Sequence, residues 1–243
     1  MLFRSLVALV ILWGGRGQND EAQFGRLMSS GKTYYEKGDS GRAIDVFQHA
    51  LAMNPANPDI HLNLANAFLL NNQPQQAATH AAEVLRAEPG SAAAHYLLGC
   101  ARLRLGDYTN AVKALQEAKD IDPTVNPVSY QLGRAFAGVG QWNDAERNFR
   151  EILEFETNHV SPVYLSTHYQ LGQSLIRQGR SDEAQRALAE HQKLNAGRQT
   201  SADNPALYER CAHTEVRAAF SLEQPEARGI PVRFDDEIGR AHV

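Results

Sequence analysis

The sequence has 243 residues, of which 43% are hydrophobic and 21% are charged, and its net charge is −4. This composition is typical of an ordered soluble protein and excludes the disordered and collagen-like classes. Lys and Arg are scattered among Asp and Glu, so no basic stripe can neutralise a phosphate backbone, and we expect no nucleic-acid partner. Cys100 and Cys211 lie far apart without metal-ligand spacing. We therefore expect no metal and no other cofactor.

The first 20 residues differ in kind from the rest. An unbroken apolar run over residues 6–13 follows Arg4 and precedes Gly14 and Gly15. Its length falls in the range of about 7 to 15 residues for the apolar part of a signal peptide, and it is well short of the roughly 18 that span a membrane. We predict that residues 1–20 are a signal peptide and that the protein is exported, to the periplasm or the medium, rather than cytoplasmic. The alternatives are an uncleaved membrane anchor or a buried helix, because no Ala-x-Ala cleavage site follows.

Residues of one type then recur along the chain at steps of 34, with one step of 39 near the end. Three columns show this recurrence: Gly31, Ala65, Gly99, Gly133 and Gly172; Ala43, Ala77, Ala111, Ala145 and Ala184; and Pro55, Pro89 and Pro123. Apolar residues between the columns have the period of a helix. A Gly or Asn stands where the first helix of each unit must end, at Gly38, Asn72, Gly106, Gly140 and Gly179. Each unit is therefore predicted to be a pair of helices.

These columns resemble the consensus of the tetratricopeptide repeat (TPR), which has small residues, an aromatic residue, an alanine and a terminal proline at fixed positions of a 34-residue unit. The first unit shows the resemblance best, with Gly31, Tyr34, Ala43, Phe47 and Pro55. The array then covers residues 21–198, with units at 24–57, 58–91, 92–125, 126–164 and 165–198. The resemblance implies an all-α fold, a right-handed superhelical solenoid of about five helix pairs that share one continuous core.

The fourth unit departs from this pattern. Thr157 stands where the earlier units have proline, and five extra residues precede the fifth unit. We expect a lengthened second helix from Trp142 to about Phe155, followed by a loop around Pro162. After the array, residues 199–236 are interpreted as a linker that contains one further helix over residues 206–219, packed as a cap.

In TPR proteins, the fifth and ninth positions of the first helices line a concave groove. Tyrosine hydroxyls, amides and guanidinium groups can hydrogen-bond a peptide backbone or a carboxylate. We therefore predict a protein or peptide partner. The predicted groove residues are Lys32, Asn66, Tyr96, Tyr130, Arg134, Tyr169 and Gln173. The alternative for the tyrosines is that they pack against the neighbouring repeat and shield its core.

One TPR specialisation is matched only in part, namely the clamp of Lys and Asn residues by which chaperone adaptors bind a C-terminal carboxylate. By resemblance, Lys belongs at the fifth position and Asn at the ninth, where the first unit has Met28 and Lys32. The second unit offers only Asn63 and Asn66. A cytosolic chaperone cofactor is therefore disfavoured.

The sequence carries no nucleophile elbow, phosphate-binding loop, zinc-protease motif or dinucleotide fingerprint. We predict a protein that is not an enzyme and has no small-molecule substrate. His61, His95 and His168 recur at the fourth position of their units. Because this is a property of the repeat, we interpret these histidines as structural.

The end of the chain changes character. Residues 229–236 alternate apolar and polar residues, and they resemble the entry strand of an FG-GAP-type β-propeller, which follows a TPR array in some exported bacterial proteins. Residues 237–243 back-translate to a sequence that resembles a sequencing adaptor, and we interpret them as an artefact. The leading hypothesis is a protein-interaction scaffold. The alternatives are the N-terminal targeting or assembly part of a larger exported β-propeller protein or enzyme, truncated here, and a cytoplasmic assembly factor.

Overall fold

The computed structural model describes residues 20–123, 126–155, 161–196 and 214–217. Within these residues the regular secondary structure is helical, as predicted, and a first helix covers residues 20–36. The helices that follow are α2 (Ser40–Met53), α3 (Pro58–Leu70), α4 (Pro74–Ala87), α5 (Ala92–Arg104), α6 (Tyr108–Ile121), α7 (Asn126–Gly138), α8 (Trp142–Phe155), α9 (Pro162–Arg177) and α10 (Ser181–Asn195).

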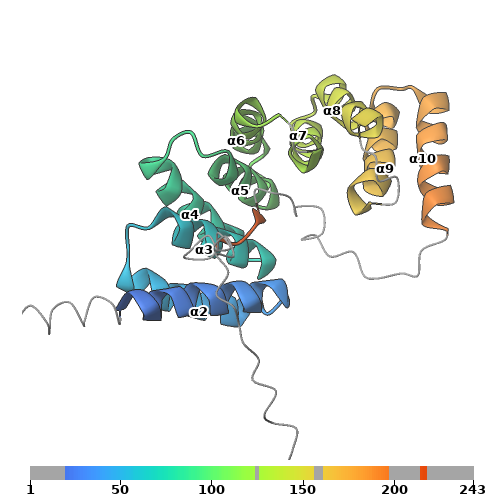
Figure 1. The fold of residues 1–243 in the computed structure, drawn as a ribbon. Coiled ribbons are helices and arrows are strands. Elements are labelled where there is room, and N and C mark those ends of the chain that lie inside the picture. Colours follow the sequence, from blue (N-terminus) through green and yellow to red (C-terminus); the bar gives the residue numbers. More distant parts are fainter. Residues whose placement is uncertain (1–19, 124–125, 156–160, 197–213, 218–243) are drawn as a thin grey trace, which may run out of the picture.

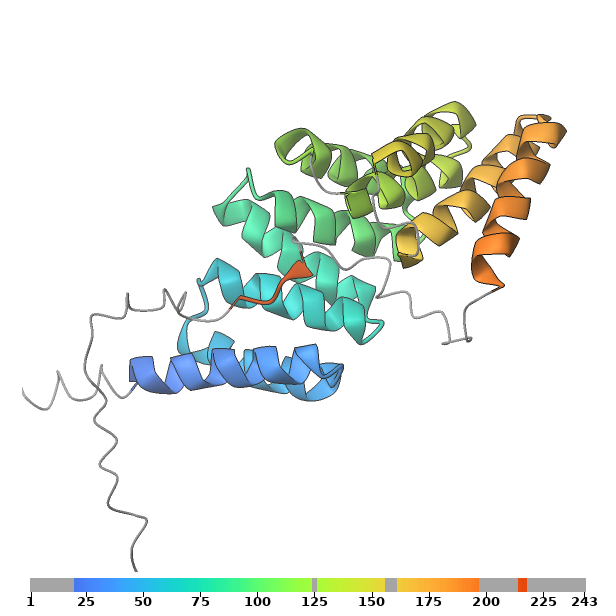
Figure 2. The same ribbon diagram turned by 45° about the vertical axis from the view of Figure 1, so that its right-hand side comes forward.

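These helices form pairs that stack into an arc (Figures 1 and 2). Each helix packs against its neighbours in sequence, and the first helices α3, α5, α7 and α9 also contact one another across the pairs. The first helices lie on the inner side of the arc, whereas α4, α6 and α8 lie on its outer side (Figure 1). We call the side formed by α3, α5, α7 and α9 the inner face. The all-helical solenoid expected from the repeats is confirmed.

Small residues in the first helices allow the two helices of a pair to approach closely. A Cβ atom on Gly31 would lie 2.4 Å from the ring of Phe47, and one on Gly133 would lie 2.6 Å from the ring of Phe149. Both rings are fully buried. In the second pair, Ala65 takes the place of the glycine and Ala81 takes the place of the phenylalanine, and both are fully buried. The larger residue on the first helix is thus matched by a smaller one on the second helix.

The turn inside each helix pair needs one residue in the left-handed region of backbone conformation. In the first pair this residue is Gly38, with φ of +78°. Its N–H donates to the carbonyl of Tyr35, and the next N–H, of Asp39, donates to the carbonyl of Tyr34. Such bonds satisfy the last carbonyls of the preceding helix. The same conformation occurs at Asn72, Gly106, Gly140 and Gly179, so the predicted turns are confirmed.

Two of the repeated histidines close the junction between consecutive pairs. His61 Nε2 lies 3.0 Å from the carbonyl oxygen of Pro55, and His95 Nε2 lies 2.9 Å from that of Pro89. In both cases the histidine at the fourth position of one unit forms a hydrogen bond with the carbonyl of the proline near the end of the previous unit. His61 Nδ1 also lies 3.0 Å from His80 Nδ1 on α4. The interpretation of His61 and His95 as structural residues agrees with these contacts.

The burial of His80 beside His61 predicts that the stability of the protein depends on pH. Burial, and then the charge of His61, lower the pKa of His80 from 6.5 to about 4. Between these values the unfolded chain takes up a proton at residue 80 that the folded chain does not, so stability rises with pH across this window and falls on acidification. We expect the melting temperature to drop by several degrees between pH 7 and pH 4.5. The drop should be smaller for His80→Gln, whereas His49→Gln, at an exposed position, should keep it. An unchanged drop in His80→Gln would contradict this assignment.

The extra residues before the last pair are not taken up as predicted. Helix α8 has the predicted bounds, Trp142 to Phe155, but its 14 residues equal the length of α2, α4 and α6, so the description of this helix as lengthened is wrong. Three of the five extra residues lie in α9, which has 16 residues where α3, α5 and α7 have 13. The others fall between α8 and α9, where residues 156–160 lie outside the described ranges. Helix α9 starts at Pro162, with Ser161 as its N-cap, so Pro162 begins a helix instead of lying in a loop. Proline suits the first helical turn because its missing N–H would have no partner there.

Several predictions fall on residues that the structure does not describe. The signal peptide, the propeller strand over residues 229–236 and the adaptor-encoded residues 237–243 lie outside the described ranges, so they stay predictions. None of the helices in the described ranges is both long and apolar enough to cross a membrane.

Candidate peptide-binding site on helix α3

A short segment from the far end of the chain, residues 214–217, lies against α3 on the inner face (Figures 1 and 2). The side-chain amide of Asn63 holds its backbone by two hydrogen bonds. Asn63 Nδ2 donates to the carbonyl oxygen of Arg217 at 2.8 Å, and the backbone N–H of Arg217 donates to Asn63 Oδ1 at 2.8 Å. Asn63 is fully buried. Its amide therefore binds an extended backbone as a neighbouring β-strand would.

The side chains of this segment alternate between buried and exposed. Thr214 and Val216 are 7% and 5% exposed, whereas Glu215 and Arg217 are exposed. Such alternation is the pattern of an extended chain with one side against a surface. Val216 belongs to the apolar core cluster that the first helix pairs share. We call residues 214–217 the strap.

A charge contact completes this arrangement. Arg217 Nη1 lies 2.6 Å from Asp59 Oδ1, one helical turn before Asn63 on α3. Both side chains are partly exposed, at 51% and 36%, so this ion pair is screened by water and adds less to stability than a buried pair would. The contact contributes mainly to selectivity, since the Asp59 carboxylate favours any bound segment that has a cationic side chain at this point.

Asn66 lies one turn beyond Asn63 on the same side of α3. It is 2% exposed, and its Nδ2 finds no hydrogen-bond partner among the described residues. A buried donor without an acceptor costs roughly 1–3 kcal/mol. The strap therefore satisfies the amide of Asn63 and leaves that of Asn66 unsatisfied.

The other predicted groove residues are distributed unevenly. Tyr96 is fully buried and Tyr130 is 3% exposed, both within the apolar core clusters, whereas Tyr169 is 44% exposed. Arg134 donates to the buried Gln131 at 2.9 Å. The burial of Tyr96 and Tyr130 favours a packing role for these two. A contact of any of these residues with a partner stays a prediction.

The remaining two predicted residues lie at opposite ends of the array. Lys32, in the first helix, pairs with Glu36 at 3.8 Å. Gln173, in α9, is partly exposed. Of the predicted set, Asn66 is the residue that lies on α3, one helical turn beyond Asn63.

Two residues of this site, Asn63 and Asp59, were not among the predicted groove residues. The prediction followed the fifth and ninth positions of each unit, and these residues occupy the sixth and second. A signal was available in the sequence, because Asn63 and Asn66 interrupt an otherwise apolar stretch of α3. Polar side chains on a buried helix face require partners, and here the partner is a peptide backbone.

Of the capping helix predicted over residues 206–219, the structure describes residues 214–217 alone, and for the others the helix stays a prediction. Residues 215–217 are not helical, and Thr214 has 3₁₀ geometry. Pairing with Asn63, Val216 burial and the contact with Asp59 favour an extended backbone instead.

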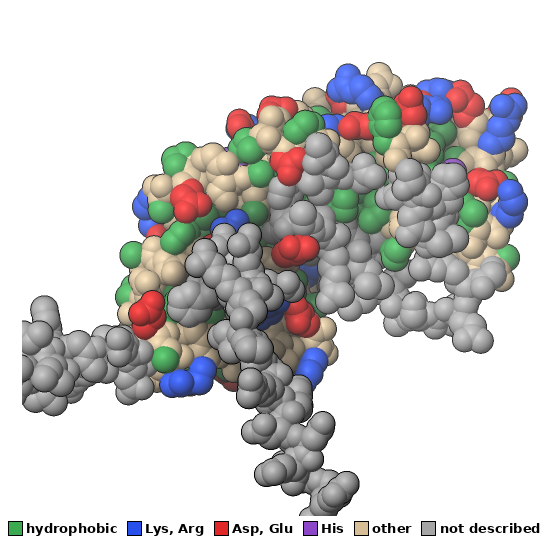
Figure 3. All heavy atoms as spheres, viewed as in Figure 1, with side chains coloured by type: hydrophobic (Ala, Val, Ile, Leu, Met, Phe, Trp, Pro, Cys, Tyr) green, Lys and Arg blue, Asp and Glu red, His purple; other side chains and the backbone are tan. Residues whose placement is uncertain are grey.

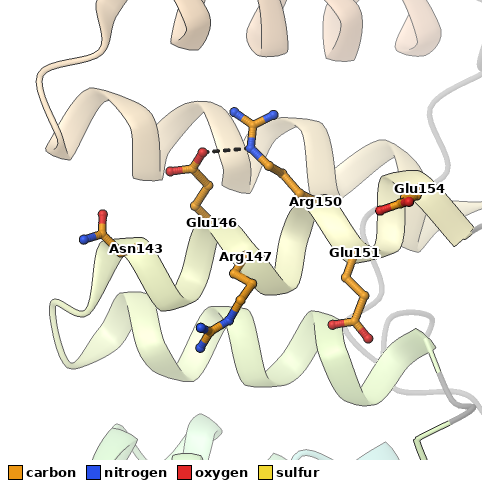
Figure 4. A pocket seen from close by; sticks show the side chains of 6 residues that line it. All are labelled: Asn143, Glu146, Arg147, Arg150, Glu151 and Glu154. Carbon is orange, nitrogen blue, oxygen red and sulfur yellow. Dashed lines mark hydrogen bonds and ion pairs between the residues drawn. The ribbon is translucent and has the colours of Figure 1, made fainter.

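Away from the site on α3, a hollow of about 460 Å³ lies over α8 (Figure 4). Its lining comes from this one helix and consists of Asn143, Glu146, Arg147, Arg150, Glu151 and Glu154. Glu146 pairs with Arg150 at 2.7 Å, and it also reaches Arg180 from the next pair. These groups link helices to one another and leave no cluster for a ligand. No group of three or more His, Cys, Asp or Glu side chains in the described part of the chain has a metal-binding arrangement.

On the face seen in Figure 3, acidic and basic side chains are interspersed over the described helices. Mixed charge of this kind is the usual state of a solvated surface. The site on α3 therefore stands out by its buried amides and by the segment lying on it.

Comparisons with known proteins agree with this fold. Over 107 residues the chain is 31% identical to the E3 ubiquitin-protein ligase CHIP of Arabidopsis thaliana, an alignment that covers 44% of this chain and 38% of the ligase. The chain thus spans well under half the length of this relative. Among solved structures, residues 41 to the end of MamA of Desulfovibrio magneticus RS-1 superpose with a TM-score of 0.64 at 17% identity, over 73% of this chain and 98% of the solved MamA chain.

A further solved structure is YrrB, described as a TPR protein with an unusual peptide-binding site, with a TM-score of 0.59 at 17% identity over 70% of this chain and 86% of YrrB. Family models of the tetratricopeptide repeat match residues 34–101, 92–125 and 165–190. They give no support to the β-propeller suggested for residues 229–236. Residues 34–125 and 165–190 of this chain are therefore tetratricopeptide repeats.

Proposed function

We propose that the protein is an interaction scaffold that binds an extended segment of a partner protein on the inner face of its repeats, with Asn63 holding the backbone of that segment. The observation that carries this proposal is the pair of 2.8 Å hydrogen bonds between the Asn63 amide and the backbone of Arg217. In this contact the side chain of Asn63 is fully buried, and both its Nδ2 and its Oδ1 form hydrogen bonds with the peptide backbone.

The similar proteins support the same kind of function. YrrB is described as having a peptide-binding site, and this chain shares its fold. TPR solenoids in general present an extended surface built from successive units, which suits a long, unfolded segment better than a small molecule. Backbone recognition through an amide requires no particular side chain, so Asn63 would supply affinity and its neighbours would supply selectivity.

The test needs an inner face from which the strap has been removed. In the full chain, Val216→Asp places a carboxylate where an apolar side chain is buried, and Arg217→Ser removes the partner of Asp59; we call this double substitution the released variant. Incubated with an array of peptides, the released variant should retain a subset of them. Adding Asn63→Ala should weaken their binding by about tenfold, since each lost bond leaves a buried group of the partner unsatisfied.

The matched control is Asn195→Ala in the same background, because Asn195 is an exposed asparagine at the end of α10. It should leave peptide binding unchanged. Circular dichroism would verify that both variants keep their helices. Peptide binding that survives Asn63→Ala, or an array from which nothing is retained, would contradict the proposed function.

A further inference from the structure

The strap contacts α3 in the way that a ligand does. It lies far from α3 in sequence, since Arg217 is 154 positions after Asn63, and it uses three different kinds of contact. Its backbone pairs with Asn63, its Val216 side chain enters the apolar cluster, and its Arg217 side chain reaches Asp59. The next residue back, Glu215, is exposed.

Each contact selects for a different property. The pair of bonds with Asn63 accepts any residue that has a backbone N–H, and so excludes only proline. The buried place of Val216 favours a compact apolar side chain, because a polar one would lose its water there without a partner. Asp59 favours an arginine at the next position, since a guanidinium offers several donors to a carboxylate. Position 215 faces solvent and imposes nothing.

We infer that the site binds partner segments in which an apolar residue is followed by arginine, and that the strap competes with them as a built-in ligand of the same type. This inference rests on the proposed function. A tethered ligand acts at an effective concentration on the order of millimolar, so even a weakly held strap suppresses binding of dilute partners.

The strap is also an incomplete ligand, which makes displacement feasible. Asn66 Nδ2 is buried with no acceptor among the described residues while the strap is in place. A partner segment that brings a carbonyl or hydroxyl oxygen to Asn66 gains a hydrogen bond that the strap does not make. Such a segment binds the site more tightly than the strap does, contact for contact.

The probe is a fluorescent peptide with the sequence of residues 212–219, AHTEVRAA. Fluorescence anisotropy should show binding to the released variant at least about tenfold tighter than to the unchanged chain, because only the latter carries a competing strap. In the released variant, a peptide with Arg217→Glu should bind about tenfold more weakly. A peptide with Glu215→Lys is the matched control, and its affinity should be nearly unchanged because this side chain faces solvent.

A charge exchange tests the contact with Asp59 directly. In the released variant, Asp59→Arg should lower the affinity for the AHTEVRAA peptide and restore binding of the peptide with Arg217→Glu. Equal affinity of the probe for the released variant and the unchanged chain would overturn competition by the strap. Peptides that bind through Asn63 without preferring an apolar residue followed by arginine would overturn the selectivity and leave the proposed function standing. If no peptide binds the released variant in a way that depends on Asn63, the proposed function itself is contradicted.

Discussion

Replacing Gly133 by leucine is expected to destabilise the protein by about 3 kcal/mol, which is at the upper end of the usual cost of overpacking a core. A Cβ atom at residue 133 would lie 2.6 Å from the ring of Phe149, closer than van der Waals contact permits. The ring has no room to move, because Phe149 is fully buried. Helices α7 and α8 would have to separate, which would also disturb their contacts with α6 and α9. Urea denaturation followed by circular dichroism measures the loss.

The matched control for this change is Gly41→Ala in α2. A Cβ atom at residue 41 would meet nothing within 4 Å, so alanine should be neutral or stabilise the helix by about 0.5–1 kcal/mol through its better helix propensity. Adding Phe149→Ala to Gly133→Leu should recover part of the lost stability, because the two side chains compete for one space. Equal stabilities of Gly133→Leu and Gly41→Ala would show that the helices of this pair are not held at their observed distance.

The features that were predictable are those that involve residues close in sequence. The small residue at Gly133 and the ring of Phe149 lie in adjacent helices of one unit, and the repeat presents the same pair of positions several times. The turn at Gly38 is similarly local, since a left-handed residue between two helical stretches satisfies carbonyls only a few residues away. Such features follow from sequence spacing because nothing outside the unit decides them.

The site on α3 depends on a contact of another kind. Asn63 pairs with Arg217 across 154 residues, and no periodicity links the two positions. Thr214 and Val216 are β-branched residues that suit an extended backbone, but local propensity does not decide which surface such a short segment contacts. The two asparagines of α3 did indicate that something polar must lie against this helix. The partner of Asn63 was identifiable only once the chain was folded.

The place of the extra residues near the fifth pair was mispredicted for a related reason. Proline was expected to mark a loop, but Pro162 starts α9, where a proline costs nothing. Ser161 just before it accepts a hydrogen bond from the N–H of Tyr164 and so fixes the start of the helix. A Ser-Pro sequence is compatible with both a loop and a helix start, and the packing of α9 on α8 selects the second.

Removal of Glu146 is expected to weaken the attachment of the last helix pair. This carboxylate, at 9% exposure, accepts hydrogen bonds from Arg150 at 2.7 Å, from Arg180 at 2.6 Å and from Gln178 at 3.0 Å. Arg180 and Gln178 belong to the turn between α9 and α10, so Glu146 ties the fifth pair to α8. Glu146→Ala should destabilise the protein by about 2 kcal/mol. This lies between the cost of losing an exposed ion pair and that of breaking a buried one, because both arginines remain partly in water.

The same carboxylate predicts how this attachment responds to acid. Burial alone would raise the pKa of Glu146, but the hydrogen bonds from Arg150, Gln178 and Arg180 outweigh it, and the pKa lies below the ordinary value of 4.5. The contribution of Glu146 is therefore complete above pH 4.5 and disappears as the pH falls through the lowered value in the folded state. The stability difference between the unchanged chain and Glu146→Gln should accordingly shrink on acidification from pH 7 to pH 3. Glu154→Gln, at an exposed position on the same helix, should show no such change, and a difference for Glu146→Gln that is constant with pH would mean that the carboxylate is not charged in its contacts with Arg150 and Arg180.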